Sequence, residues 1–137
     1  MARPEGLERA LQERSGHLAT VRPDGRPHVV VVTFAVTHDQ IVTAIDRKPK
    51  TTERLQRLVN IEANPSVSFL VDHYEEDWDG LWWVRIDGRA SIHASGRVWR
   101  DAIDALTARY GQYRKQRPAG PVIAIAQESV TSWASTP

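Results

Sequence analysis

Cysteine is absent from this 137-residue chain, and its absence excludes several kinds of chemistry. Without a thiol the protein cannot form a disulfide, bind a metal through thiolates or use a cysteine nucleophile. A chain without cysteine also fits a reducing compartment, so we expect a cytoplasmic protein.

Long apolar runs and a surplus of charge of one sign are missing too. No run approaches the length of a membrane span, and the N-terminus is a polar amphipathic stretch rather than a signal peptide, so we expect no membrane association. The net charge is +1 and the cations are spread among acidic residues. This pattern argues against a nucleic-acid partner.

The motifs of several enzyme classes are also absent. The chain has no G-x-S-x-G, Walker or G-x-G-x-x-G motif, so hydrolase, P-loop and Rossmann functions have no support. The five histidines show no H-E-x-x-H pairing, and the acidic stretch 72–80 does not have the spacing of a calcium loop. We therefore predict no metal site.

What is present is the composition of one globular domain covering residues 1–137, with 41% hydrophobic and 26% charged residues. Apolar and alternating runs predict six strands, at residues 17–22, 26–36, 41–45, 66–71, 81–93 and 122–133. Helical periodicity predicts about three helices, at 4–14, before residue 64 and at 97–110, and residues 111–121 form a polar connection. Antiparallel strands of this size usually close into a barrel. We predict a mainly β (β+α) fold, a six-stranded antiparallel barrel with flanking helices.

The run Val29–Val32 contains no polar residue, so we expect its strand to be covered on both faces. One cover is the core of the domain. The other is a helix, a ligand or another subunit.

The segment Asp46–Thr52 joins a predicted strand to a predicted helix and contains three cations. A helix N-terminus favours an anion because its first N–H groups are unpaired. Lys48, Lys50 and Thr51 would add charge-assisted hydrogen bonds to a phosphate. The alternative is a solvated basic turn with a threonine N-cap.

A series of short motifs runs through roughly residues 15–93. The motifs are Leu18–Val21, Asp24–His28, Lys48–Thr51, Arg57–Ile61, Asn64–Pro65, Leu70–Tyr74, Asp77–Trp78 and Leu81–Arg85 with Gly88. In their order and spacing they resemble the pyridoxamine-5'-phosphate-oxidase-like split β-barrel family. The resemblance is greatest to the branch of this family that uses coenzyme F420, a deazaflavin.

This resemblance implies an FMN-binding type of split barrel, a homodimer and a cofactor held at the subunit interface. The residues implied to hold the cofactor's phosphate are Lys48, Lys50 and Thr51. Those implied to line its ring include His28, Thr33 and Thr43. Arg47, Arg54 and Arg57 extend the positive charge, which suits the phosphate and oligoglutamate tail of F420 better than FMN. The chain is shorter than the true pyridoxamine phosphate oxidases and lacks their arginine-rich C-terminus, so oxidation of vitamin B6 is not expected.

Trp83 lies on the otherwise polar side of its predicted strand. A large ring at that position is a wall of the cofactor pocket, a dimer contact, or a group that packs on Trp99. The sequence leaves these alternatives open.

We therefore expect an oxidoreductase that transfers a hydride between reduced F420 and an electron-poor small molecule. The alternatives are an FMN-dependent oxidoreductase of the same fold and a non-catalytic flavin or deazaflavin carrier. The cofactor supplies the chemistry, so no catalytic side chain is assigned, and His28 and Tyr74 are only candidate proton donors.

Overall fold

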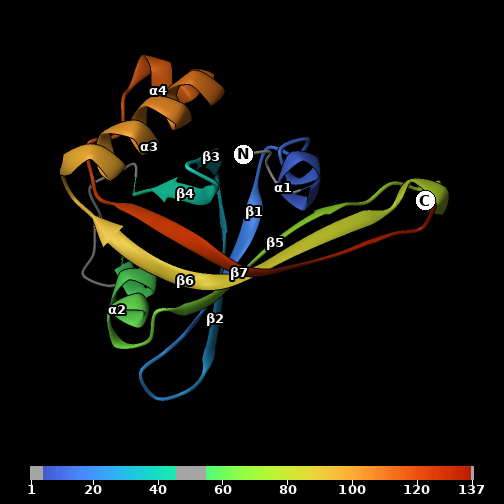
Figure 1. Cartoon of the computed structure of the whole chain (residues 1–137), viewed down its shortest axis with the longest axis horizontal. Helices are drawn as coiled ribbons and strands as arrows, with labels where there is room; N and C mark the ends of the chain where they lie inside the picture. The colour runs from blue at the N-terminus through green and yellow to red at the C-terminus, as the bar shows by residue number, and fades with distance from the viewer. Residues whose placement is uncertain (1–4, 46–54, 137) are drawn as a thin grey trace.

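The structure is a computed structural model that describes residues 5–45 and 55–136. Within these residues seven strands form one antiparallel sheet in the order β2-β1-β5-β6-β7-β4-β3 (Figure 1). The strands are β1 Gly16–Val21, β2 Pro27–Val32, β3 Ala35–Thr37, β4 Gln40–Ala44, β5 Ser66–His73, β6 Trp82–His93 and β7 Val122–Ala134. The helices are α1 Glu5–Ala10, α2 Gln56–Ala63, α3 Gly96–Arg109 and α4 Gly111–Lys115, with a 3-10 turn at Trp78–Gly80. The split-barrel class predicted from sequence is confirmed, with one more strand than expected.

Alternating burial along the strands gives the curled sheet an inner and an outer face. In β6 the residues Trp82, Val84 and Ile86 are buried, whereas Trp83 and Arg85 between them are not. Because side chains of a strand point alternately to its two faces, the buried set defines the inner face. The sequence correctly predicted that Trp83 lies on the face of β6 opposite its apolar residues.

Helices cover the inner face and one end of the sheet. α1 contacts β6 and β7, and α2 contacts β1 and β6, so that both helices add apolar side chains to the main core. α3 packs on β3 and β4 and forms a second cluster there. β4 lies between the two clusters, which explains why all four residues from Ile41 to Ala44 are buried.

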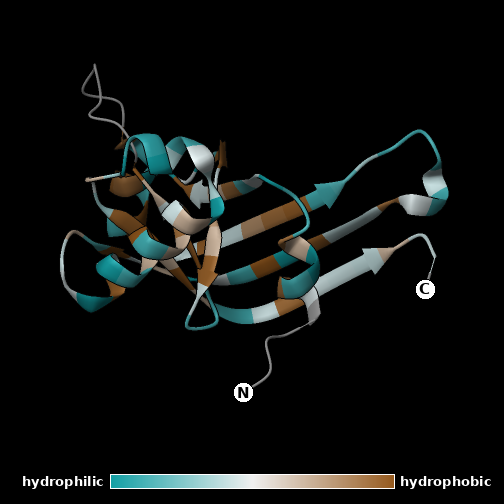
Figure 2. Cartoon of the chain, turned by 90° about the horizontal axis from the view of Figure 1, so that it is seen from above, coloured by the Kyte–Doolittle hydropathy of each residue, from teal (hydrophilic) through white to brown (hydrophobic). Residues whose placement is uncertain are grey.

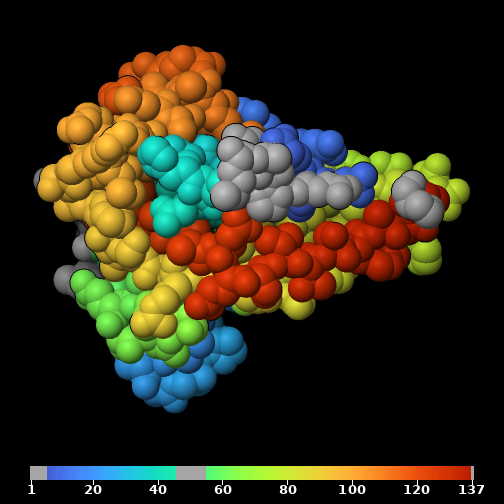
Figure 3. Space-filling view, in the orientation of Figure 1, coloured from blue at the N-terminus to red at the C-terminus, as the bar shows by residue number. Residues whose placement is uncertain are grey.

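The longest strands extend beyond this body. β5, β6 and β7 form an arm whose tip lies beside the C-terminus (Figures 1 and 3). The distal part of β7 is hydrophilic in comparison with the body (Figure 2). A bulge at Asp87/Gly88 interrupts the register of β6 with β7, and bulges of this kind bend a sheet.

The strand predicted at residues 26–36 is in fact two strands, β2 and β3, which lie at opposite edges of the sheet. Between them Phe34 is fully buried, and its backbone pairs with a side chain instead of a neighbouring strand. The N–H of Phe34 donates to the Tyr110 hydroxyl at 3.1 Å, and the carbonyl oxygen of Phe34 lies 3.0 Å from that hydroxyl. This side-chain partner breaks the strand and accounts for the seventh strand.

The same tyrosine holds other parts of the chain. The Tyr110 hydroxyl lies 2.7 Å from the carbonyl oxygen of Arg14 and accepts from Nε of Arg109 at 3.2 Å. Tyr110 follows α3 directly, and α4 begins at the next residue. The prediction of a polar connection at 111–121 was therefore wrong at its start, where the chain forms α4.

Within the described residues Val29–Val32 is covered on one face only. Val32 is buried in the core, but Val29 and Val31 point to the outer face and are 61% and 66% exposed. No helix among the described residues covers them. A ligand or another subunit as the second cover stays a prediction.

None of the helices that the structure describes is long and apolar enough to cross a membrane.

Replacing Tyr110 with phenylalanine removes the hydroxyl and keeps the ring. The buried N–H of Phe34 then loses its partner, so we expect the free energy of unfolding to fall by about 1–3 kcal/mol. Urea unfolding followed by tryptophan fluorescence measures this change. Tyr74→Phe, at a tyrosine that is 62% exposed, is the control and should stay within about 0.5 kcal/mol of wild type. Equal stabilities of the two variants would contradict the role given to Tyr110.

His73 joins the chain that follows α1 to the distal end of β5. Its ring nitrogens lie 3.2 Å from a Glu13 carboxylate oxygen and 2.6 Å from one of Glu75, and the ring stacks on Trp82 at 5.9 Å. The hydrogen bond to Glu75 raises the pKa of His73; burial opposes this, and the bond to Glu13 raises the pKa further. The folded state therefore favours the protonated ring.

The raised pKa of His73 gives its contribution to stability a definite pH dependence. The contribution is fully present below the ordinary value of 6.5 and is lost as the pH rises through the higher folded value. We expect His73→Gln to lower the melting temperature more at about pH 6 than at about pH 9. The control is His93→Gln, which removes a ring bonded to the Ser91 hydroxyl. A His73→Gln effect that is the same at both pH values would rule out this ion-paired role.

Candidate cofactor-binding site

A small polar pocket lies where β2 and β4 end. It has a volume of about 180 Å³ and is lined by Val31, Val32, Thr33, Thr43, Ala44, Arg57 and Tyr113. The lining comes from β2, β4, α2, α4 and the link between β2 and β3. We refer to it below as the polar pocket.

Each polar side chain of this pocket is held by a different part of the fold. Thr43 is almost fully buried on β4, opposite Ile123 of β7. The hydroxyl of Thr33, just beyond β2, lies 2.7 Å from the hydroxyl of Tyr113 on α4. Arg57 enters from the first turn of α2. Three hydroxyls and one guanidinium are thereby brought to the same space.

The pocket is also next to the basic segment along the chain. Ala44 precedes residues 46–54 by two positions, and Arg57 follows them by three. The segment itself, with Arg47, Lys48, Lys50, Thr51 and Arg54, lies outside the described residues. The residues just before and just after the basic segment, Ala44 and Arg57, therefore both line the polar pocket.

The pocket suits an anionic or oxygen-rich group. A guanidinium and hydroxyls are donors that bind phosphate and carboxylate oxygens. Pockets that enclose a whole small ligand usually measure about 300–1,000 Å³, so this space can take only part of a cofactor. The remainder of a cofactor would need surfaces outside the polar pocket.

His28 lies nearby, beneath α2. It pairs with Thr20 across β1 and β2, and the hydroxyl of Thr20 accepts from the Asn60 side chain at 2.9 Å. The Nδ1 atom of His28 is buried and has no hydrogen-bond partner among the described residues. Burial lowers the pKa of His28, and the charges of Arg22 and Arg57 lower it further. The imidazole is therefore neutral at neutral pH.

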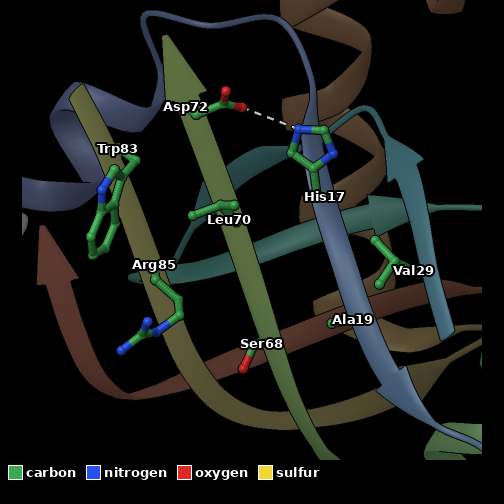
Figure 4. Close-up of a pocket in the computed structure, with 8 residues that line it drawn as sticks. All are labelled: His17, Ala19, Val29, Ser68, Leu70, Asp72, Trp83 and Arg85. Carbon is green, nitrogen blue, oxygen red and sulfur yellow. Dashed lines mark hydrogen bonds and ion pairs between the residues drawn. The ribbon is translucent and has the colours of Figure 1, made fainter. Parts of the chain in front are cut away.

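A second and larger hollow lies on the outer face of the sheet. It measures about 710 Å³ and is lined by His17, Ala19, Val29, Ser68, Leu70, Asp72, Trp83 and Arg85 (Figure 4). His17 Nε2 is 3.2 Å from an Asp72 carboxylate oxygen, and the Arg85 guanidinium lies 5.8 Å from the centre of the Trp83 ring. We call this hollow the outer groove.

Trp83 therefore belongs to the outer groove. Trp99 instead lies on α3, packs against the second cluster and donates its indole N–H to the carbonyl oxygen of Gly120 at 2.9 Å. Of the three alternatives for Trp83, packing on Trp99 is not what the structure shows. The outer groove and the polar pocket share no lining residue.

The structure thus gathers some of the predicted site residues and separates another. Thr33, Thr43 and Arg57 line one pocket, and His28 lies close enough to Arg57 for that charge to lower its pKa. Trp83 lies on the outer face, apart from them.

Tyr113 is a polar lining residue that the sequence did not predict, because residues 111–121 carry the pattern of a polar connection. The available signal was its spacing of three residues from Tyr110, which places both rings on one side of a continuing helix. Their ring centroids are 5.6 Å apart.

The lowered pKa of His28 can be tested by following the imidazole protons by NMR during a pH titration. We expect a midpoint below the ordinary value of 6.5. Arg57→Gln should raise the midpoint, since it removes one of the two nearby charges, but should not restore 6.5, because burial persists. A midpoint at or above 6.5 in wild type would contradict the buried, neutral state of this ring.

The pyridoxamine 5'-phosphate oxidase family model matches residues 4–134. No curated protein matches the chain. Three similar solved structures show the same fold.

A conserved hypothetical protein, Rv2991 from Mycobacterium tuberculosis, has a TM-score of 0.78 at 24% identity, over 98% of this chain and 86% of that one. The heme storage protein HutZ from Vibrio cholerae has a TM-score of 0.73 at 22% identity, over 97% and 95%. An FAD-binding protein from Mesorhizobium loti has a TM-score of 0.67 at 22% identity, over 89% and 84%. The family model covers nearly the whole chain, and the chain therefore belongs to the pyridoxamine 5'-phosphate oxidase family.

Proposed function

We propose that this protein is an oxidoreductase that binds reduced coenzyme F420 and passes a hydride to an electron-poor small molecule. The observation that supports this most is the polar pocket, which is lined by Thr33, Thr43 and Arg57. The chain on both sides of the basic segment contributes to this lining. These residues are far apart in sequence, so their convergence is a property of the fold.

The residues of the pocket and the segment divide the binding of the cofactor between them. Arg57 and the two threonines contact a charged or oxygen-rich part of the cofactor. Lys48, Lys50 and Thr51 hold its phosphate, and Arg47 and Arg54 attract the acidic tail.

The bound deazaflavin supplies the hydride, and the chain supplies binding, orientation and exclusion of water. His28 is neutral at neutral pH, and its Nδ1 atom has no hydrogen-bond partner within residues 5–45 and 55–136, so its ring can hydrogen-bond a ligand without adding charge. Tyr74, the other candidate proton donor, is 62% exposed and bonds with the Trp78 indole.

We also propose that the active form is a homodimer with the cofactor between its subunits. The support is the uncovered outer face, where Val29 and Val31 are mostly exposed, and where Trp83 and Leu70 line the outer groove. Contiguous apolar surface of this kind marks interaction sites in soluble proteins. The polar pocket is also too small to hold a whole cofactor, so a partner subunit would supply the rest of the site.

The second candidate is an FMN-dependent oxidoreductase or a non-catalytic carrier on the same fold. The similarity to an FAD-binding protein favours a flavin, and the similarity to a heme storage protein makes heme a third ligand to test. A fold of this kind does not decide between them.

Titration with F420, FMN and heme, followed by fluorescence quenching or absorbance, separates these candidates. We expect F420 to bind most tightly, because the arginines and lysines attract its acidic tail. Tight binding of FMN or heme together with no binding of F420 would refute the first proposal. Binding of F420 without turnover of any quinone or enone would point to a carrier.

Changing Lys48 and Lys50 together to alanine tests the phosphate role. We expect F420 affinity to fall by a few kcal/mol, about 1.5–3 for each charge-assisted hydrogen bond lost. Lys115 is the third lysine of the chain and ends α4, so Lys115→Ala is a control that removes a lysine charge elsewhere and should bind F420 like wild type. Unchanged affinity in the double variant would remove the two lysines from the site.

A further inference from the structure

Two tyrosines hold two consecutive residues at the edge of the polar pocket. Tyr110 and Tyr113 lie where α3 meets α4, and their rings meet edge to face at 74°. The first bonds the backbone of Phe34, and the second bonds the side chain of Thr33. Backbone and side chain at this point are therefore both set by helices about eighty residues further along the chain.

The chemistry of the two hydroxyls gives the bond between Tyr113 and Thr33 a direction. A phenol is more acidic than an aliphatic alcohol, so the Tyr113 O–H is the better donor and the Thr33 oxygen the better acceptor. Thr33 then keeps its own proton. A threonine hydroxyl has more than one accessible rotamer, and a bond of 2.7 Å to a buried ring selects one of them.

We propose that Tyr113 is a positioning residue of the polar pocket. By donating to Thr33 Oγ1 it turns the Thr33 O–H into a donor for a phosphate oxygen on the bound cofactor. Arg57, in the same lining, supplies the opposite charge. This inference rests on the proposed function, because it assigns a role within the same site.

A structural role of the Tyr113 ring can be separated from a role of its hydroxyl. The ring is 5% exposed and belongs to the cluster formed by α3, β3 and β4. Phenylalanine keeps this packing and removes only the hydroxyl. The effect of Tyr113→Phe on ligand binding therefore reports on the hydroxyl.

The test is calorimetric titration of wild type, Tyr113→Phe, Thr33→Val and the double variant. The ligands are whichever of F420 or FMN binds wild type and the form of that cofactor without phosphate. We expect each single variant to weaken the phosphorylated cofactor roughly tenfold or more. The double variant should be no weaker than Thr33→Val, because Tyr113 acts through Thr33. The form without phosphate should bind all four proteins equally.

Two further variants serve as controls. Thr33→Ser keeps the hydroxyl and should restore most of the affinity lost in Thr33→Val. Thr131→Val removes an exposed hydroxyl from the distal part of β7 and should bind like wild type. Additive losses in the double variant, or equal losses for both forms of the cofactor, would overturn the proposal while leaving the proposed function standing.

Inorganic pyrophosphate gives a readout that does not depend on the identity of the cofactor. If wild type binds neither F420 nor FMN, a rise in melting temperature with pyrophosphate that disappears in both Tyr113→Phe and Thr33→Val supports the anion-positioning role and refutes the proposed function. If neither cofactor binds and pyrophosphate has no effect on wild type, both proposals are overturned.

Discussion

The hydrogen bonds between the Tyr110 hydroxyl and the backbone of Phe34 are the constraint on which the architecture depends. Phe34 is fully buried, with its ring 5.0 Å from that of Phe69, and buried backbone groups need partners. Because a side chain supplies them, the chain can leave β2 at one edge of the sheet and begin β3 at the other. The link therefore joins the two edge strands of the sheet, which do not pair with each other.

The polar pocket follows from this break. It lies beside the link, where strand ends and helices meet and where hydroxyls can face a space instead of a neighbouring strand. Thr33 would point to one face of a regular strand if β2 continued. Placed after the strand, it bonds with Tyr113 and lines the pocket with Thr43 and Arg57. The same interaction thus supports both the curl of the sheet and the site.

Membership of the family and choice of ligand rest on different physical features. The family follows from the match of its model to residues 4–134, and similar structures include a heme storage protein and an FAD-binding protein. The ligand depends on charge and shape near the pocket and on what covers the outer face. In the polar pocket the only charge among the described lining residues is the guanidinium of Arg57, and the nearby His28 is neutral. The basic segment, residues 46–54, has four cations and can add more charge than the pocket.

The sequence by itself determined the fold class and the face of β6 on which Trp83 lies, because alternation is a local property of the chain. That Thr33, Thr43 and Arg57 line one pocket was decided by the fold. The sequence could not determine the break between β2 and β3, the helix α4 or the role of Tyr113. These depend on hydrogen bonds between residues about eighty positions apart, and no local pattern records such a partner. That Trp83 lines the outer groove and not the polar pocket was likewise decided by tertiary structure, because the pairing of the strands sets which residues line each hollow.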